Sequence, residues 1–224
     1  MKIGRTLFVI YIGMFTSSVF GSVILDQSNV YSFPPGGLSV DSTFDAGQTF
    51  TVGVAGRLAH VDLQVMRFQN TSLPLFLDIR TTSGGLPTES NTSTLTTVSM
   101  APTNLTVFTG GNISFPIVAF DVSAANIAVT PGEQLAITLR SANASSDGYI
   151  WLTGGQANDA YAAGSAVNRA SGGTWQVLSG INLQDASFQT FVSVPEPASM
   201  VLLALPLLLA HRRKGRMHAR SLQA

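Results

Sequence analysis

Apolar and polar side chains alternate along much of the chain. Residues 59–65, 75–80 and 135–139 carry apolar side chains at every odd position and mostly polar ones between them. A period of two predicts strands with one buried face, so we expect Phe76, Asp78 and Arg80 on the opposite face of their strand from the apolar residues between them. Shorter runs predict further strands at 48–52, 95–100, 117–122, 149–153, 174–178 and 188–192.

Clusters of glycine and proline separate these segments, and no helical period competes with the strands. The clusters fall at 34–37, 83–85, 110–112, 131–132, 154–155 and 172–173. Many short strands joined by such turns predict an all-β fold, namely an antiparallel β-sandwich that is jelly-roll-like, with a closed barrel as the alternative. The Ser- and Thr-rich segment 90–109 is read as the solvent face of two edge strands, or else as an exposed connection.

The N-terminal segment has the three regions of a signal peptide. Lys2 and Arg5 precede an apolar run at 7–15, and small residues follow as far as Gly21. This order predicts secretion with cleavage after Gly21. An uncleaved anchor is the alternative, although the apolar run is short for a membrane span.

The C-terminal segment is apolar and ends in basic residues. Residues 198–210 are apolar except for Ser199 and Pro206, and Arg212, Arg213 and Lys214 follow. A short membrane helix with a basic cytoplasmic stop explains this order and places the domain outside. A buried helix is the alternative, but such a helix is normally amphipathic. The predicted organisation is a signal peptide (1–21), an extracytoplasmic domain (22–193), a sorting segment (194–216) and a polar tail (217–224).

Two prolines flank the one acidic residue of this sorting segment. Pro195 and Pro197 keep the backbone around Glu196 extended and accessible. Together with the apolar run and the basic stop, these residues resemble the PEP-CTERM sorting signal of Gram-negative envelope proteins. The resemblance implies an exosortase-type processing enzyme as partner, transient residence in the inner membrane, and a final location in the cell envelope or extracellular biofilm matrix.

The domain between the two terminal segments also resembles a family. Its strand and turn patterns look like those of the choice-of-anchor domains of bacterial surface proteins. The similar segments are 46–52, 77–87, 130–137, 159–166, Trp175 and 188–192. The resemblance implies a surface domain without an assigned enzymatic activity.

The charge of residues 22–194 and the absence of cysteine limit the functions that are expected for the domain. Between residues 22 and 194 there are five arginines, no lysine and eleven acidic residues, a net charge of −6, and the chain has no cysteine. An acidic domain without a basic stripe is a poor nucleic-acid binder, so no nucleic-acid partner is expected. Stability must come from the packed core, because no disulfide can form.

The inventory of catalytic residues is small. His60 is the single histidine between residues 22 and 194; it shares a strand face with Asp62, and no serine stands in a G-x-S-x-G context. We interpret the two as a solvated surface pair and expect neither a catalytic residue nor a zinc site. Asp147 and Asp159 are the candidates for a calcium site, although no D-x-D-x-D loop is present; otherwise no cofactor is expected.

Aromatic residues give the candidate binding site. Tyr149 and Trp151 share one face of a predicted strand, and Asn158, Asp159 and Tyr161 follow closely. Aromatic faces beside amide and carboxylate groups suit sugar stacking, whereas the alternative is that the rings are ordinary core. The sequence thus predicts an exported, non-enzymatic protein with a structural or adhesive role. A carbohydrate-binding module for exopolysaccharide is the alternative hypothesis. A secreted hydrolase with paired carboxylates is the third and least favoured hypothesis.

Overall fold

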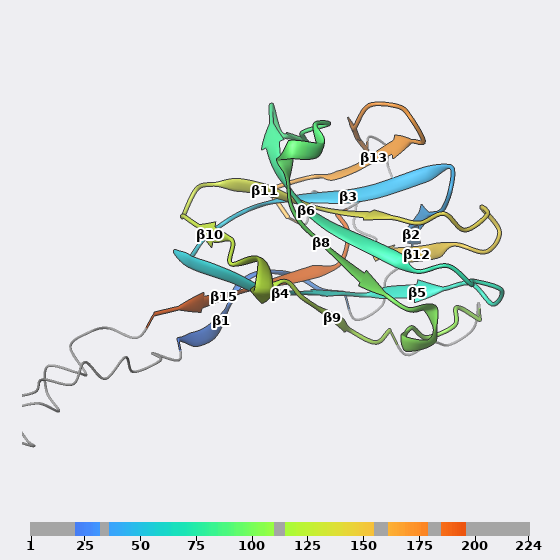
Figure 1. Ribbon diagram of the computed structural model, residues 1–224, viewed down its shortest axis with the longest axis horizontal. Coiled ribbons are helices and arrows are strands. Elements are labelled where there is room, and N and C mark those ends of the chain that lie inside the picture. The colour runs from blue at the N-terminus through green and yellow to red at the C-terminus, as the bar shows by residue number, and fades with distance from the viewer. Residues whose placement is uncertain (1–20, 32–35, 110–114, 155–160, 179–184, 196–224) are drawn as a thin grey trace, which may run out of the picture. The chain divides into compact units, whose positions relative to one another are not determined.

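The computed structural model describes residues 21–31, 36–109, 115–154, 161–178 and 185–195. Within them the chain forms strands and three short 3-10 helices, and no α-helix (Figure 1). The strands are β1 (Ser22–Asn29), β2 (Gly36–Val40), β3 (Phe44–Thr51), β4 (Gly56–Leu63), β5 (Val65–Arg67), β6 (Leu75–Ser83), β7 (Leu86–Pro87), β8 (Thr94–Met100), β9 (Val118–Asp121), β10 (Ala128–Val129), β11 (Gln134–Arg140), β12 (Tyr149–Thr153), β13 (Ala166–Ala170), β14 (Gln176–Val177) and β15 (Phe188–Val194). The 3-10 helices are η1 (Asn91–Ser93), η2 (Pro102–Asn104) and η3 (Ser123–Ala125).

Eight of the strands pair in a nested order. β1 pairs with β15, β3 with β11, β4 with β9, and β6 with β8, each time antiparallel. The outermost strands of this set along the chain therefore pair with each other, and so do the innermost. Two further pairings, β15 with β4 and β11 with β6, then join the pairs side by side into sheets.

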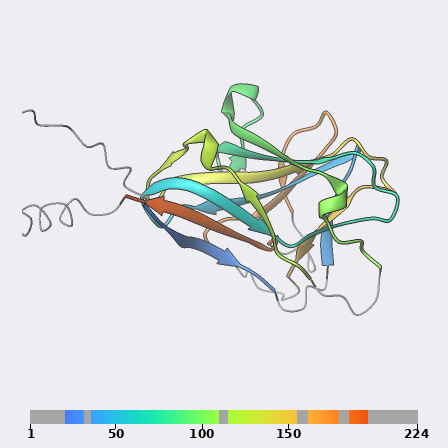
Figure 2. The same cartoon turned by 60° about the horizontal axis from the view of Figure 1, so that its bottom comes forward.

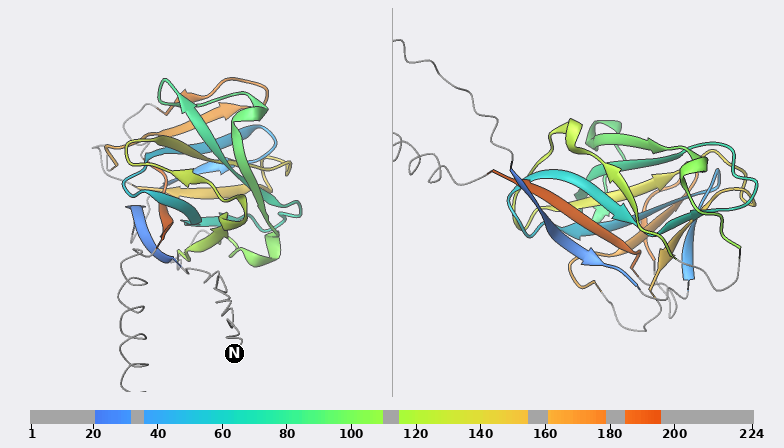
Figure 3. Two further views of the ribbon diagram at one scale, coloured as in Figure 1. Left: turned by 60° about the vertical axis from the view of Figure 1, so that its left-hand side comes forward. Right: turned by 90° about the horizontal axis from the view of Figure 1, so that it is seen from below.

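In the described part of the chain the result is three antiparallel sheets. One has the order β1-β15-β4-β10, with β9 also paired to β4, and Figures 2 and 3 show β1, β15, β4 and β9 side by side. The largest has the order β14-β13-β3-β11-β6-β7, with β8 also paired to β6. A small sheet, β2-β12-β5, completes the fold. The predicted all-β, antiparallel class is confirmed.

One hydrophobic core lies between the sheets. Val61 and Leu63 of β4 face Leu77 and Ile79 of β6 as members of this core, and all four are fully buried. Ring contacts also cross between the larger sheets, because Phe50 of β3 lies 6.1 Å from Phe188 of β15 between ring centroids. The alternation in the sequence therefore identified the inward faces of these strands, and burial of those faces is the main stabilising contribution.

The outer face of the largest sheet differs from expectation. Asp78 and Arg80 lie on the side of β6 away from the core, as the alternation requires, yet they are only 4% and 5% exposed. Thr97 of β8 and Arg140 of β11 hydrogen-bond to Asp78, whereas the segment after β7 holds Arg80 through the carbonyl oxygens of Thr88 and Ser90. The outer side of β6 is therefore largely closed to solvent at these two residues.

Several strands were not predicted. β1 contains the run Val23-Ile24-Leu25, which is exposed at the sheet edge and does not alternate. β2 begins at Gly36, inside a predicted turn, and β13 lies in a stretch of small residues. Segment 90–109 contains one strand, β8, together with η1 and η2, and not the two expected edge strands.

Both ends of the compact unit Ser22–Val194 meet in one strand pair. Ser22 of β1 is the register partner of Val194 of β15, so the chain enters and leaves the domain at the same place. None of the described residues forms a helix long and apolar enough to cross a membrane. The predicted signal peptide up to Phe20 and the predicted sorting residues from Glu196 onward lie outside the described residues.

Candidate functional site

The first two aromatic residues of the predicted glycan site are core residues. Tyr149 and Trp151 lie on β12, the central strand of the small sheet, and both are fully buried. The indole Nε1 of Trp151 donates to the Ser187 carbonyl oxygen at 2.9 Å, and the Tyr149 hydroxyl donates to that of Leu73 at 2.6 Å. Burial raises the pKa of Tyr149 to about 12. The prediction that these rings are offered to a ligand is wrong, because their shared strand face points into the core.

Tyr161 is also mostly buried, with 8% exposure. Its ring meets Phe188 edge-on at 5.0 Å between centroids, and its hydroxyl donates to Oε1 of Gln27 at 2.9 Å. Burial raises the pKa of Tyr161 to about 12. Asn158 and Asp159, the polar members of the predicted glycan site, lie outside the described residues.

His60 and Asp62 lie on the outer side of β4. The His60 ring stacks on Phe191 at 4.1 Å between centroids, and its Nε2 is 3.8 Å from Oδ1 of Asp62. Burial raises the pKa of Asp62, against the lowering effect of His60. Asp147, one of the two calcium candidates, is half-buried in the turn before β12, whereas Asp159 is not described. Among the described residues, no group of three or more His, Cys, Asp or Glu side chains is placed to hold a metal ion.

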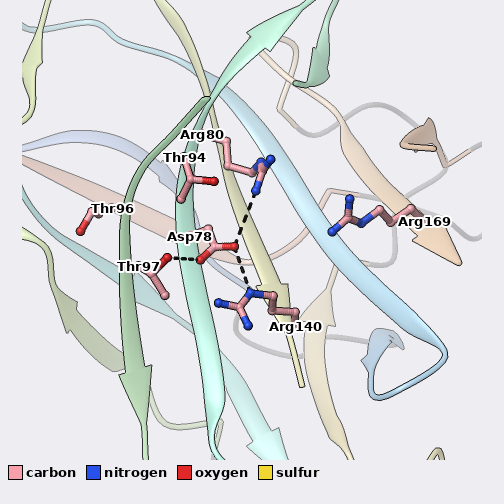
Figure 4. Close-up of a pocket in the computed structure, with 7 residues that line it drawn as sticks. All are labelled: Asp78, Arg80, Thr94, Thr96, Thr97, Arg140 and Arg169. Atoms are coloured by element: carbon pink, nitrogen blue, oxygen red, sulfur yellow. Dashed lines mark hydrogen bonds and ion pairs between the residues drawn. The ribbon is translucent and has the colours of Figure 1, made fainter. Parts of the chain in front are cut away.

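A different site lies on the outer face of the largest sheet. It is a hollow of about 550 Å³, which we call the arginine hollow, and Figure 4 shows the side chains around it. The lining residues are Asp78 and Arg80 of β6, Thr94, Thr96 and Thr97 of β8, Arg140 of β11 and Arg169 of β13. Three of the five arginines between residues 22 and 194 therefore gather here.

Strand register produces this gathering. Thr97 lies opposite Asp78, and Thr94 opposite Arg80, in the β6–β8 pair. On the other side of β6, β11 brings Arg140 opposite Phe76. β3 lies between β11 and β13 in the sheet, so Arg169 reaches the hollow from across two strands, β11 and β3 (Figure 4).

Asp78 is the central acceptor of the arginine hollow. Thr97 Oγ1 donates to its Oδ1 at 2.6 Å, and Arg140 Nε donates to its Oδ2 at 3.2 Å. Nη1 of Arg80 is 3.8 Å from the same Oδ2. Both carboxylate oxygens are therefore engaged, and the group is closed to solvent.

Arg80 is fixed by backbone oxygens. Its Nε and Nη2 donate to the Thr88 carbonyl at 3.2 and 2.8 Å, and Nη2 also donates to that of Ser90 at 3.1 Å. Burial is the main cause that lowers the pKa of Arg80; the charges of Arg169 and Arg140 lower it further, while Asp78 opposes them. The guanidinium groups of Arg169 and Arg140 thus stand close enough to Arg80 to disfavour its charged form.

Arg169 is held from three sides. Its Nε donates to Oδ2 of Asp45 at 2.9 Å and its Nη1 to Oε2 of Glu89 at 2.8 Å. The guanidinium carbon lies 4.7 Å above the Trp175 ring, which adds a cation–π contact. Burial raises the pKa of Asp45 despite the lowering effect of Arg169.

Arg140 is the most open of the three. Its side chain is 43% exposed, and its guanidinium lies 4.5 Å above the Phe76 ring. In the described part of the chain, neither terminal nitrogen of Arg140 has a hydrogen-bonding partner. A second hollow of about 290 Å³ begins on the other side of Arg140 and extends past Asp45 and Ser141.

The arrangement suits binding better than hydrolysis. Asp78 is the one carboxylate among the seven residues around the arginine hollow, and it is already saturated. A pair of carboxylates on either side of a scissile bond, as glycoside hydrolysis needs, is not formed by these residues. The sequence placed Asp78 and Arg80 on one strand face, but Arg140 and Arg169 join them only through pairing across the sheet.

No protein-family model matches this chain, and no curated protein matches it at a significant level.

Proposed function

We propose that this protein is exported and displayed at the cell envelope or in the extracellular matrix, where its domain has a structural or adhesive role. The main observation that supports this proposal is the β1–β15 pair, in which Ser22 and Val194 are register partners. The segments that precede and follow the domain, with their export and sorting patterns, therefore leave it at one end.

The nested pairing of the eight main strands supports a jelly-roll-like sandwich as the finer description of the fold. This order is the one obtained when a long two-stranded ribbon folds over itself into two sheets. Jelly rolls commonly serve as rigid binding or packing modules, and fold alone does not assign a function. The role proposed here depends on the terminal segments and on the surface of the domain.

Glycan binding is the second candidate, and the arginine hollow favours it over hydrolysis. The hollow is open, polar and of a size found for small-ligand sites, roughly 300–1,000 Å³. Its lining combines guanidinium groups with threonine hydroxyls.

Intact-mass analysis of the envelope fraction tests the proposal. In cells that contain an exosortase-type enzyme, the recovered protein should lack residues 1–21 and the apolar run from Met200 onward. Replacing Glu196 by Gln and both flanking prolines, Pro195 and Pro197, by Ala should leave the tail attached, because the recognition segment is then altered.

A matched change within the polar tail, Ser221→Ala, serves as the control and should be processed normally. Recovery of wild-type protein that still carries Met200–Ala224 in the presence of the enzyme would refute the sorting proposal. Recovery of the protein from the cytoplasm with its N-terminus intact would refute export.

A further inference from the structure

The open hydrogen-bonding capacity of the arginine hollow consists mainly of donors. The carboxylate oxygens of Asp78 are engaged by Thr97 and Arg140, and they are closed to solvent. By contrast, both terminal nitrogens of Arg140, and Nη2 of Arg169, have no hydrogen-bonding partner among the described residues. A guanidinium group has donors and no acceptor, so a ligand must bring acceptors to satisfy these groups.

The guanidinium groups are also positioned before any ligand arrives. Backbone carbonyls hold Arg80, two carboxylates hold Arg169, and the Phe76 ring supports Arg140. Figure 4 shows Arg80 and Arg169 directed toward each other from opposite sides of the opening. An anionic group bound by the open donors of Arg140 and Arg169 would offset the repulsion between the guanidinium groups. It would cost little side-chain ordering, since Arg169 is already held by two carboxylates and Arg140 is supported by the Phe76 ring.

Charge balance selects the kind of anion. The three arginines are matched by Asp45, Asp78 and Glu89, which ion-pair with them. A site with no net charge, in a domain of net charge −6, attracts a singly charged planar group better than a phosphate dianion. A carboxylate fits the paired donors of a guanidinium group in shape and in charge.

Threonine hydroxyls complete the lining on the β8 side. Thr94 stands opposite Arg80 in the β6–β8 register, and its hydroxyl can donate or accept as the ligand requires. Guanidinium donors for a carboxylate, together with a threonine hydroxyl on the β8 side for a neighbouring alcohol, match an acidic sugar. We propose that the arginine hollow binds carboxylate-bearing sugar units of an acidic polysaccharide.

This inference rests on the proposed surface role for access to the polymer, but its test does not depend on sorting. Binding of the purified full chain, kept in mild detergent, is measured against polygalacturonate by affinity electrophoresis and calorimetry. Polygalacturonate should bind, and neutral dextran should not. Binding that fails for protein correctly sorted in cells would overturn the inference alone, whereas mis-sorted protein that still binds would overturn the surface role alone.

Matched variants locate the site. Arg140→Gln should weaken polygalacturonate binding about tenfold or more, because it removes charge-assisted donors to the ligand. Arg57→Gln, the same change at an exposed arginine on β4 outside the hollow, should change affinity by less than about twofold. Arg140→Lys keeps the charge but loses the planar fork, so it should bind more weakly than wild type.

A second variant tests whether weaker binding results from the loss of a ligand contact or from a loss of folded protein. Thr94→Val removes one hydroxyl from the lining with little change in volume, and it should weaken binding severalfold while the thermal midpoint stays close to that of wild type. Equal losses in Arg140→Gln and Arg57→Gln would overturn the site, as would equal binding of dextran. Binding of free galacturonate together with failure to bind the polymer would overturn the polysaccharide assignment and leave a small-carboxylate site.

Discussion

Trp151 offers the sharpest test of the core assignment. The structure buries the indole completely in the centre of β12 and gives its Nε1 a partner, the carbonyl oxygen of Ser187, at 2.9 Å. Trp151→Ala removes the largest fully buried side chain of the domain as described, and it leaves a cavity where the small sheet meets the core. It also leaves a buried carbonyl without its donor.

The expected cost is large for a domain of this size. Truncation of a buried aromatic side chain to Ala costs about 3–5 kcal/mol, while a domain typically has only about 5–15 kcal/mol of stability. Trp151→Phe keeps much of the packing and loses the Nε1 donor, so it should cost roughly 1–3 kcal/mol. The order of stability should be wild type, then Trp151→Phe, then Trp151→Ala.

Urea unfolding of residues 22–194, followed by far-UV circular dichroism, measures these differences. With an m value of roughly 2 kcal/mol/M, Trp151→Ala should lower the midpoint by about 2 M. Val177→Ala is the control, because Val177 is 52% exposed and its loss should change stability by no more than about 0.5 kcal/mol. If Trp151→Ala unfolds within about 1 kcal/mol of wild type, the indole is not a core anchor and an exposed ring becomes tenable again.

Two further predictions concern Gly164 and Asp45. A Cβ at Gly164 would overlap the Thr49 carbonyl oxygen, so Gly164→Ala should force a backbone shift and lower the unfolding free energy in the same urea assay by about 1–3 kcal/mol; an unchanged midpoint would contradict this. Burial raises the pKa of Asp45 above its usual 3.8, so the folded domain takes up this proton at a higher pH than the unfolded chain does. The contribution of Asp45 to stability should therefore increase as the pH falls through the folded pKa, and wild type should gain stability relative to Asp45→Asn on acidification from neutral pH. A loss relative to that variant over the same pH range would show that the sign is wrong.

Much of the strand content could be predicted from the sequence because alternation is a local property. Residues 59–65, 75–80 and 135–139 carry their apolar side chains two apart, and any strand formed there must place them on one face. The same reasoning failed for β1, since its apolar residues are consecutive and exposed, and its pairing with β15 spans almost the whole domain. Local pattern carries no information about such a distant partner.

The candidate site shows the same limit. Tyr149 and Trp151 were placed correctly on one strand face, but only the packing of the small sheet against the core determines that this face is the inner one. Arg140 and Arg169 stand 60 and more residues from Asp78 in the chain, and no spacing rule links them.

The sequence by itself determined the all-β class, the acidic and lysine-free composition of residues 22–194, the absence of disulfides, and the expectation of export and sorting. Each of these follows from composition or from the local order of residues. The tertiary structure alone decided which strands pair, which face of β12 is buried, and that three arginines converge around one hollow. These features depend on strand register across the sheet, and register is fixed by the joint burial of many distant side chains rather than by neighbours in the chain.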